Sequence, residues 1–118
     1  MAIQKFEDII VWQKAQDFSI AIYNEFKNNK DYSFTDQIKR ASVSISNNIA
    51  EGFDRSSNPD FKRFLYFSLA SNSEVRSMLY LAERLNFIPK ETSNELINNS
   101  NEIARMLFGQ IKSLKQSN

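Results

Sequence analysis

The sequence predicts one all-α domain, an up-down antiparallel four-helix bundle, from three observations. Apolar residues recur every three or four positions through four long segments, as in amphipathic helices. The 118 residues include only two glycines and two prolines, too few for the turns that many short strands need. A chain of this length suits one domain with one core, so we expect residues 1–118 to fold as a unit.

Two helices are expected in the first half of the chain. The first is predicted at about residues 8–27 and the second at about 35–53. The hydroxyls of Ser33 and Thr35 suit the start of the second helix, where they can accept hydrogen bonds from its first N–H groups. Gly52 and the polar residues after it end the second pattern. The apolar stripe of the first helix consists of Ile9, Trp12, Ala15, Phe18 or Ser19, Ile22 and Phe26.

The third helix is predicted at about residues 59–86, with Asn58 as its N-cap and Pro59 in its first turn. Its apolar arc is wider than a single seam, so we expect it to sit centrally or to pack against a second surface such as another subunit. A lone bundle would expose several of its large side chains. These are Phe64, Tyr66, Phe67 and Met78.

The fourth helix is predicted at about residues 90–114, beginning after Pro89. Gly109 lies inside it and lowers helix stability by about 1 kcal/mol relative to alanine, and close packing would explain this glycine. Short connections between four helices of this length give antiparallel neighbours, which is the up-down bundle.

The absence of histidine and cysteine limits the chemistry that this chain can perform. It excludes zinc fingers, disulfide frameworks, Ser-His and Cys-His nucleophile pairs, and the di-iron bundle with its Glu-x-x-His pairs. Two separated glycines cannot form a phosphate-cradling loop. We therefore expect no enzyme, no cofactor and no bound metal. The alternative is a hydrolase that uses Glu51 and Glu74 as a pair of carboxylates, about 5 to 10 Å apart.

The first residues lack the pattern of a signal peptide, and no apolar run approaches the ~20 residues of a membrane span. We expect a cytoplasmic protein with no membrane partner. The formal charge of +1 gives nucleic-acid binding no support from bulk charge. A closed oligomer can still concentrate one sign of charge on a single face.

Polar residues at spacings of three and four share one face of the second helix, next to its apolar stripe. Antiparallel packing would bring this face toward Glu74 in the third helix, where Ser68 and Asn72 are also polar. Three interpretations stay open: a solvated edge of the core, a polar network that fixes register and oligomeric state, and a ligand or partner site. The predicted network comprises Gln37, Arg40, Ser44, Asn48, Glu51 and Glu74.

Basic residues are expected to gather at one end of the bundle, where the chain termini and the connection between the second and third helices meet. Acidic residues occupy the same end, so an ordinary solvated surface is the alternative to a phosphate-binding patch. The candidate nucleic-acid contacts are Lys5, Arg55, Lys62, Arg63, Lys112 and Lys115.

Several strings in this sequence form a recognisable set. They are FEDIIVWQKA at 6–15, QIKRASVSI at 37–45 and NIAEGF at 48–53, followed by Phe61, Phe64-Leu65 and SNSEV at 71–75. In combination they resemble the four-helix bundle proteins known as 23S ribosomal RNA intervening-sequence proteins, over nearly the whole chain. The sequence departs from that pattern at Ala70, where the family often has glycine.

The resemblance implies a four-helix protomer that assembles into a ring-like homopentamer, similar to the accessory variability determinant of diversity-generating retroelements. That relative is strongly basic and binds nucleic acid and a reverse transcriptase. We therefore expect a non-enzymatic oligomeric interaction protein, a scaffold or adaptor for RNA, DNA or a reverse-transcriptase-like protein. The alternative is a purely protein-binding structural module without nucleic-acid contact.

Overall fold

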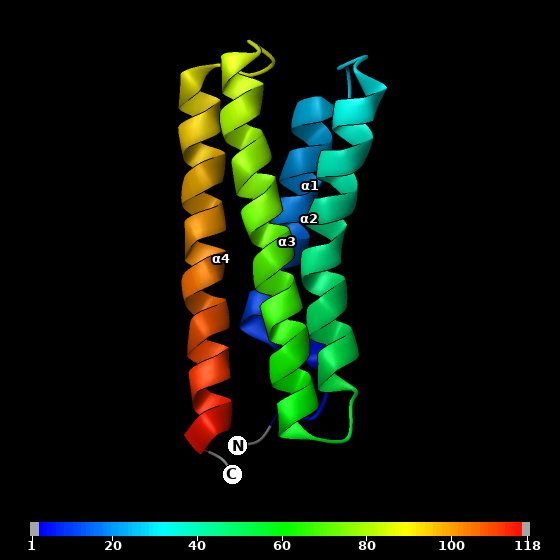
Figure 1. Ribbon diagram of the computed structural model, residues 1–118, viewed down its shortest axis with the longest axis vertical. Coiled ribbons are helices and arrows are strands. Elements are labelled where there is room, and N and C mark those ends of the chain that lie inside the picture. Colours follow the sequence, from blue (N-terminus) through cyan, green and yellow to red (C-terminus); the bar gives the residue numbers. More distant parts are fainter. Residues whose placement is uncertain (1–2, 117–118) are drawn as a thin grey trace.

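The computed structural model describes residues 3–116, with side chains as far as Leu114. A short 3-10 helix, η1 (Phe6–Asp8), precedes four long helices. These are α1 (Ile10–Phe26), α2 (Tyr32–Phe53), α3 (Asn58–Arg84) and α4 (Lys90–Gln116). Consecutive helices run in opposite directions in a rod of 47 × 21 × 20 Å (Figure 1). The described residues contain no strand, so the predicted all-α four-helix bundle is confirmed.

The ends of the helices differ from the predicted ones by a few residues. The second helix starts three residues early, because the Asp31 carboxylate accepts a hydrogen bond from the backbone N–H of Phe34 at 3.1 Å. At the third helix the N-cap is Ser57 and not Asn58, since the Ser57 hydroxyl accepts from the N–H of Asp60. Where several capping residues stand together, sequence spacing alone does not decide which one caps.

The core runs along the whole rod and is made from one face of each helix. Its fully buried side chains include Ile22, Ile38, Ile45, Leu65, Leu79 and Leu107. Around this core α2 packs on α1 and α3, while α4 packs on α3 and α1. Helices α1 and α3 therefore occupy opposite corners of the bundle, and each presents an outer face of its own.

Buried polar side chains set the level at which α3 meets its two neighbours. Asn72 donates through Nδ2 to the carbonyl of Ser100, and the Ser100 hydroxyl donates to Oδ1 of Asn72, each at 2.9 Å. On the other side, the Ser68 hydroxyl donates to the carbonyl of Ile45 at 2.8 Å. Because an unpaired buried polar group is costly, these bonds penalise any sliding of α3 along α2 or α4.

The two glycines lie in contrasting surroundings. A Cβ atom added at Gly52 would lie 2.5 Å from Cβ of Phe64 and 3.0 Å from Cδ1 of Phe61, so the absence of a side chain lets the end of α2 approach α3. At Gly109 an added Cβ atom would meet nothing within 4 Å. The expectation that close packing explains Gly109 is therefore wrong within the protomer.

Replacing Gly109 by alanine is expected to stabilise the protein by about 1 kcal/mol, since the helix gains propensity and no atom obstructs the methyl group. Chemical denaturation followed by circular dichroism, at one fixed protein concentration, measures this difference. A loss of stability would show that something outside the protomer lies against this position.

Candidate interaction surface

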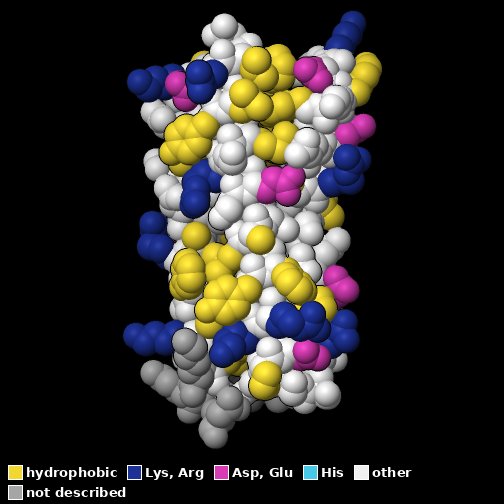
Figure 2. Space-filling model, in the orientation of Figure 1, with side chains coloured by type: hydrophobic (Ala, Val, Ile, Leu, Met, Phe, Trp, Pro, Cys, Tyr) yellow, Lys and Arg dark blue, Asp and Glu magenta, His cyan; other side chains and the backbone are white. Residues whose placement is uncertain are grey.

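The outer face of α3 carries a row of large side chains that the bundle does not cover. Figure 2 shows hydrophobic side chains gathered along this side of the rod in a lower and an upper group. The exposed members are Tyr66, Phe67, Tyr80 and Leu81 on α3 and Leu85 at its C-cap, and we call these five residues the α3 face. Phe64 and Met78, which the sequence had grouped with them, are instead buried in the protomer. The wide apolar arc is thus divided between core and surface.

Between its two apolar groups, the α3 face has a middle section of small side chains. Ala70, Ser73 and Ser77 point to the same side of the helix as Tyr66 and Tyr80, at spacings of three and four residues, and all three are exposed. Alanine and serine allow another backbone to approach closely. The face therefore has a profile of large, small and large side chains, suited to a neighbouring helix.

The predicted polar network is placed beside the α3 face, on the adjoining side of α2. Gln37 donates through Nε2 to Oε2 of Glu74 at 3.1 Å, in an exposed position. Asn48 bonds within its own helix, to the carbonyl and hydroxyl of Ser44 at 2.8 and 3.2 Å. Arg40 and Glu51 are exposed. Four of the six residues thus form two separate local contacts, Gln37 with Glu74 and Ser44 with Asn48, and the six do not form one buried network.

Gln37→Ala is expected to change the free energy of unfolding by less than about 0.5 kcal/mol, because its hydrogen bond to Glu74 is exposed to water. Denaturation at a fixed protein concentration measures the change. Asn72→Ala is the buried comparison and should lose more. An equal loss in both variants would mean that Gln37 is covered in solution.

The lower end of the bundle in Figure 1 brings together the α2–α3 connection, the start of the described chain and the last turns of α4. Arginines stack on aromatic rings here. The guanidinium of Arg55 lies 4.7 Å from the ring centre of Phe64, and that of Arg63 lies 5.0 Å from Phe64 and 5.5 Å from Phe67. The two rings meet edge to face at 5.4 Å. This cluster combines stacking surface with donors for phosphate.

The remaining candidate nucleic-acid contacts lie at the same end, apart from Lys115, whose side chain is outside the described residues. Lys5 and Lys112 are exposed, and Lys62 is half-buried. Arg63 is paired with Asp60 at 3.2 Å. Acidic residues also occupy this end, namely Glu7, Asp8, Glu51, Asp54 and Asp60. Basic and acidic side chains are therefore mixed here.

Two observations bear on catalysis. Glu51 follows Gln37 on α2 by 14 residues, about 21 Å along the helix, whereas Gln37 touches Glu74. The two carboxylates thus lie too far apart to act as a hydrolytic pair. Among the described residues, no group of three or more Asp and Glu side chains is arranged to hold a metal ion.

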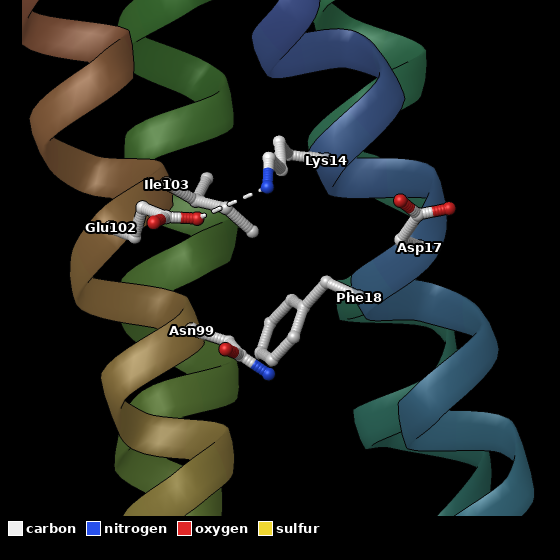
Figure 3. A pocket seen from close by; sticks show the side chains of 6 residues that line it. All are labelled: Lys14, Asp17, Phe18, Asn99, Glu102 and Ile103. Atoms are coloured by element: carbon white, nitrogen blue, oxygen red, sulfur yellow. Dashed lines mark ion pairs between the residues drawn. The ribbon is translucent and has the colours of Figure 1, made fainter.

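A hollow of 150 Å³ lies between α1 and α4, and Figure 3 shows the side chains around it. Lys14 on α1 reaches across to Glu102 on α4, with 3.7 Å between Nζ and Oε1. Asp17 points away from this pair, and Phe18 points into the space between the helices. Both members of the ion pair are half exposed, so it contributes little to stability. We assign this hollow no chemistry.

Comparison with protein-family models gives a match to the family described as 23S rRNA-intervening sequence protein, over residues 7–109. The chain belongs to that family. The match spans α1, α2 and α3 and most of α4, so the resemblance drawn from the sequence strings is confirmed.

Among solved structures, this chain is similar to a crystal structure from Bacteroides thetaiotaomicron, a protein of unknown function from the S23 ribosomal protein family. The two are 30% identical with a TM-score of 0.82, over 87% of this chain and 99% of the other. No curated protein matches the sequence. No helix in the described part of the chain is both long and apolar enough to cross a membrane.

Proposed function

We propose that this member of the family is a cytoplasmic, non-enzymatic interaction protein that works as an oligomer. The main observation that supports this proposal is the α3 face. Soluble monomers rarely leave large apolar side chains gathered along one helix, and such patches usually mark a protein interface. Phe108 on α4 is also exposed, and it follows by seven residues Asn101, which accepts a hydrogen bond from Arg76 of α3, so it lies on the side of α4 next to α3. Without histidine or cysteine, the chain has no Ser-His or Cys-His pair and no imidazole or thiolate to bind a metal.

The proposed assembly is a ring-like homopentamer, which is what the family resemblance implies. Its role would be that of a scaffold or adaptor that presents several copies of one surface. Multiple copies raise the avidity for a partner with repeated sites, even where each contact is weak. We propose neither a membrane nor a metal as a partner.

The proposed assembly is tested by light scattering coupled to size exclusion. The wild-type chain should run as a pentamer, and Tyr66→Asp/Leu81→Asp should reduce it to a monomer by placing one charge in each apolar group. Ile10→Asp is the matched control, since Ile10 is 55% exposed on α1, away from the α3 face. A wild-type monomer, or a double variant with wild-type mass, contradicts the proposal.

A nucleic acid is the first candidate partner, and the arginine–aromatic cluster of Arg55, Arg63, Phe64 and Phe67 is the observation that favours it. Guanidinium groups held over aromatic rings can bind phosphate, and the ring of Phe67, which is exposed, can stack on a base, whereas the Phe64 ring is buried. Five copies of the cluster on one end of a ring would add their separate contacts. The mixed charge of this end favours the alternative, a purely protein-binding module.

A nucleic-acid scaffold and a purely protein-binding module are distinguished by adding a mixed pool of single-stranded and structured RNA at low and physiological salt. A nucleic-acid scaffold should bind RNA and release it as the salt concentration rises. The double variant Arg55→Gln/Arg63→Gln should bind RNA more weakly. Lys27→Gln/Lys30→Gln removes the same charge from the opposite end and should leave binding unchanged. An oligomer that does not bind RNA at low salt supports the alternative, the protein-binding module.

A further inference from the structure

A shallow groove on another side of the bundle, between α1 and α2, has the dimensions of a binding site. Its volume is 350 Å³, within the range of about 300 to 1,000 Å³ that is usual for ligand pockets. We call it the α1–α2 groove. It is lined by Gln16, Ser19, Ile20, Tyr23 and Asn24 from α1 and by Val43 and Ser46 from α2.

The polar floor of the α1–α2 groove is already satisfied within the protomer. The Ser19 hydroxyl donates to the carbonyl of Ser42 at 2.9 Å, and Gln16 donates to the Ser46 hydroxyl at 3.1 Å. What the groove offers an occupant is therefore its apolar rim. Ile20 is 59% exposed there, the highest fraction of any described aliphatic side chain. The lining carries no charge, which suits an uncharged helix face.

We infer that the occupant of the α1–α2 groove is the α3 face of a second copy of this chain. The inference rests on the proposed oligomer and specifies its interface. Because α1 and α3 stand at opposite corners of the bundle, the groove and the face lie on different sides of the protomer. Joining two different surfaces gives a head-to-tail contact, which leaves one of each free and forms a ring when the rotation from copy to copy closes, as the proposed oligomer requires.

The heights of the two surfaces along the rod agree. We take the rotation axis of the proposed ring to be parallel to the rod; every residue then keeps its own height, and α3 of one copy meets its neighbour at the same level. Contacts of neighbouring α2 residues, Ile45 with Ser68 and Ser46 with Gln16, place Ser68 and Gln16 at one height. Phe67 and the small residue Ala70 would therefore lie opposite the groove.

Residues of opposite charge also lie at matching heights on the two surfaces. Gln37 contacts Glu74, and Lys39, two residues further along α2, holds its Nζ 5.2 Å from the ring centre of Tyr23 at the groove. Glu74 of one copy would thus reach the height of Lys39 of the next, as an ion pair across the interface. Further up, the exposed Tyr32 at the start of α2 lies at about the height of Tyr80 in the upper apolar group.

Mixing variants tests the head-to-tail contact. Ile20→Asp damages only the groove, and Tyr66→Asp/Leu81→Asp damages only the α3 face. Each should be monomeric alone, but an equimolar mixture should form dimers with twice the protomer mass, since one intact groove can still receive one intact face. The control Ile10→Asp, on the same helix and 55% exposed, should keep the wild-type mass alone. Circular dichroism of each variant verifies that it is folded.

Two results would overturn the inference while leaving the proposed oligomer standing. One is an Ile20→Asp variant that keeps the wild-type mass, which would show that the groove is not part of the interface or that the α3 face pairs with itself. The other is a mixture that stays monomeric although both variants are folded. A wild-type chain that is itself monomeric would instead contradict the proposed function.

A charge exchange tests the register of the interface. Glu74→Lys should lower the fraction of oligomer at a given concentration by placing two lysines opposite each other, and adding Lys39→Glu should restore it. Gln37→Ala, which removes the intramolecular partner of Glu74 but no charge, should not alter assembly. Failure of the exchange to restore assembly would contradict the predicted alignment of the two copies.

Discussion

Asn72→Leu is expected to lower the free energy of unfolding by about 2 kcal/mol, although leucine is apolar and similar in size. Asn72 and Ser100 are almost completely buried, and they exchange two hydrogen bonds of 2.9 Å between α3 and α4. With leucine at 72, the Ser100 hydroxyl loses its acceptor in a place that water does not reach. An unpaired polar group in such a place costs about 1–3 kcal/mol.

A double-mutant cycle separates the hydrogen bonds from the effect of changing volume. Ser100→Ala alone should also destabilise, because it leaves Oδ1 of Asn72 without its donor. The combination Asn72→Leu/Ser100→Ala should lose less than the sum of the two, since both partners are then apolar. Denaturation of all four proteins at one concentration provides the numbers. Strictly additive losses would mean that the pair contributes nothing beyond its packing.

The Asn72–Ser100 pair also shows what could not be predicted from the sequence. The helical period revealed the four helices and the buried stripes, because burial repeats with the turn of the helix. It marked Asn72 as a polar residue within an apolar segment. It could not name Ser100 as the partner, since that requires the relative height of α3 and α4. A serine in step with Leu96, Ile103 and Leu107 looks like a small core residue.

The α3 face could be predicted only in part, again because the sequence does not show how the helices pack against one another. The wide apolar arc of the third helix correctly indicated that more than one face is apolar. Periodicity could not separate the buried Phe64 and Met78 from the exposed Tyr66 and Phe67, which depends on how closely α2 approaches. Nor does any local pattern identify the α1–α2 groove, because its lining comes from two helices whose side chains meet only in the folded chain.

Gly52→Ala is expected to destabilise the protein by about 1–2 kcal/mol, against the usual preference of helices for alanine. The added methyl group would lie 2.5 Å from Cβ of Phe64, so α2 and α3 would have to separate at this end. Overpacking of this kind costs about 1–3 kcal/mol, and the gain in helix propensity, about 1 kcal/mol, offsets part of it. Denaturation at fixed concentration measures the net loss.

Gly109→Ala is the matched control for Gly52→Ala, because both variants add the same methyl group to a glycine inside a long helix. Only position 52 has a neighbour in the way, so the two substitutions should shift stability in opposite directions. Phe64→Ala keeps the obstructing Cβ atom, and the penalty at 52 should persist in that background. If it disappeared, the Phe64 ring would be what sets the helix spacing. Either result bears on the end of the bundle where Arg55 and Arg63 stack on that same ring.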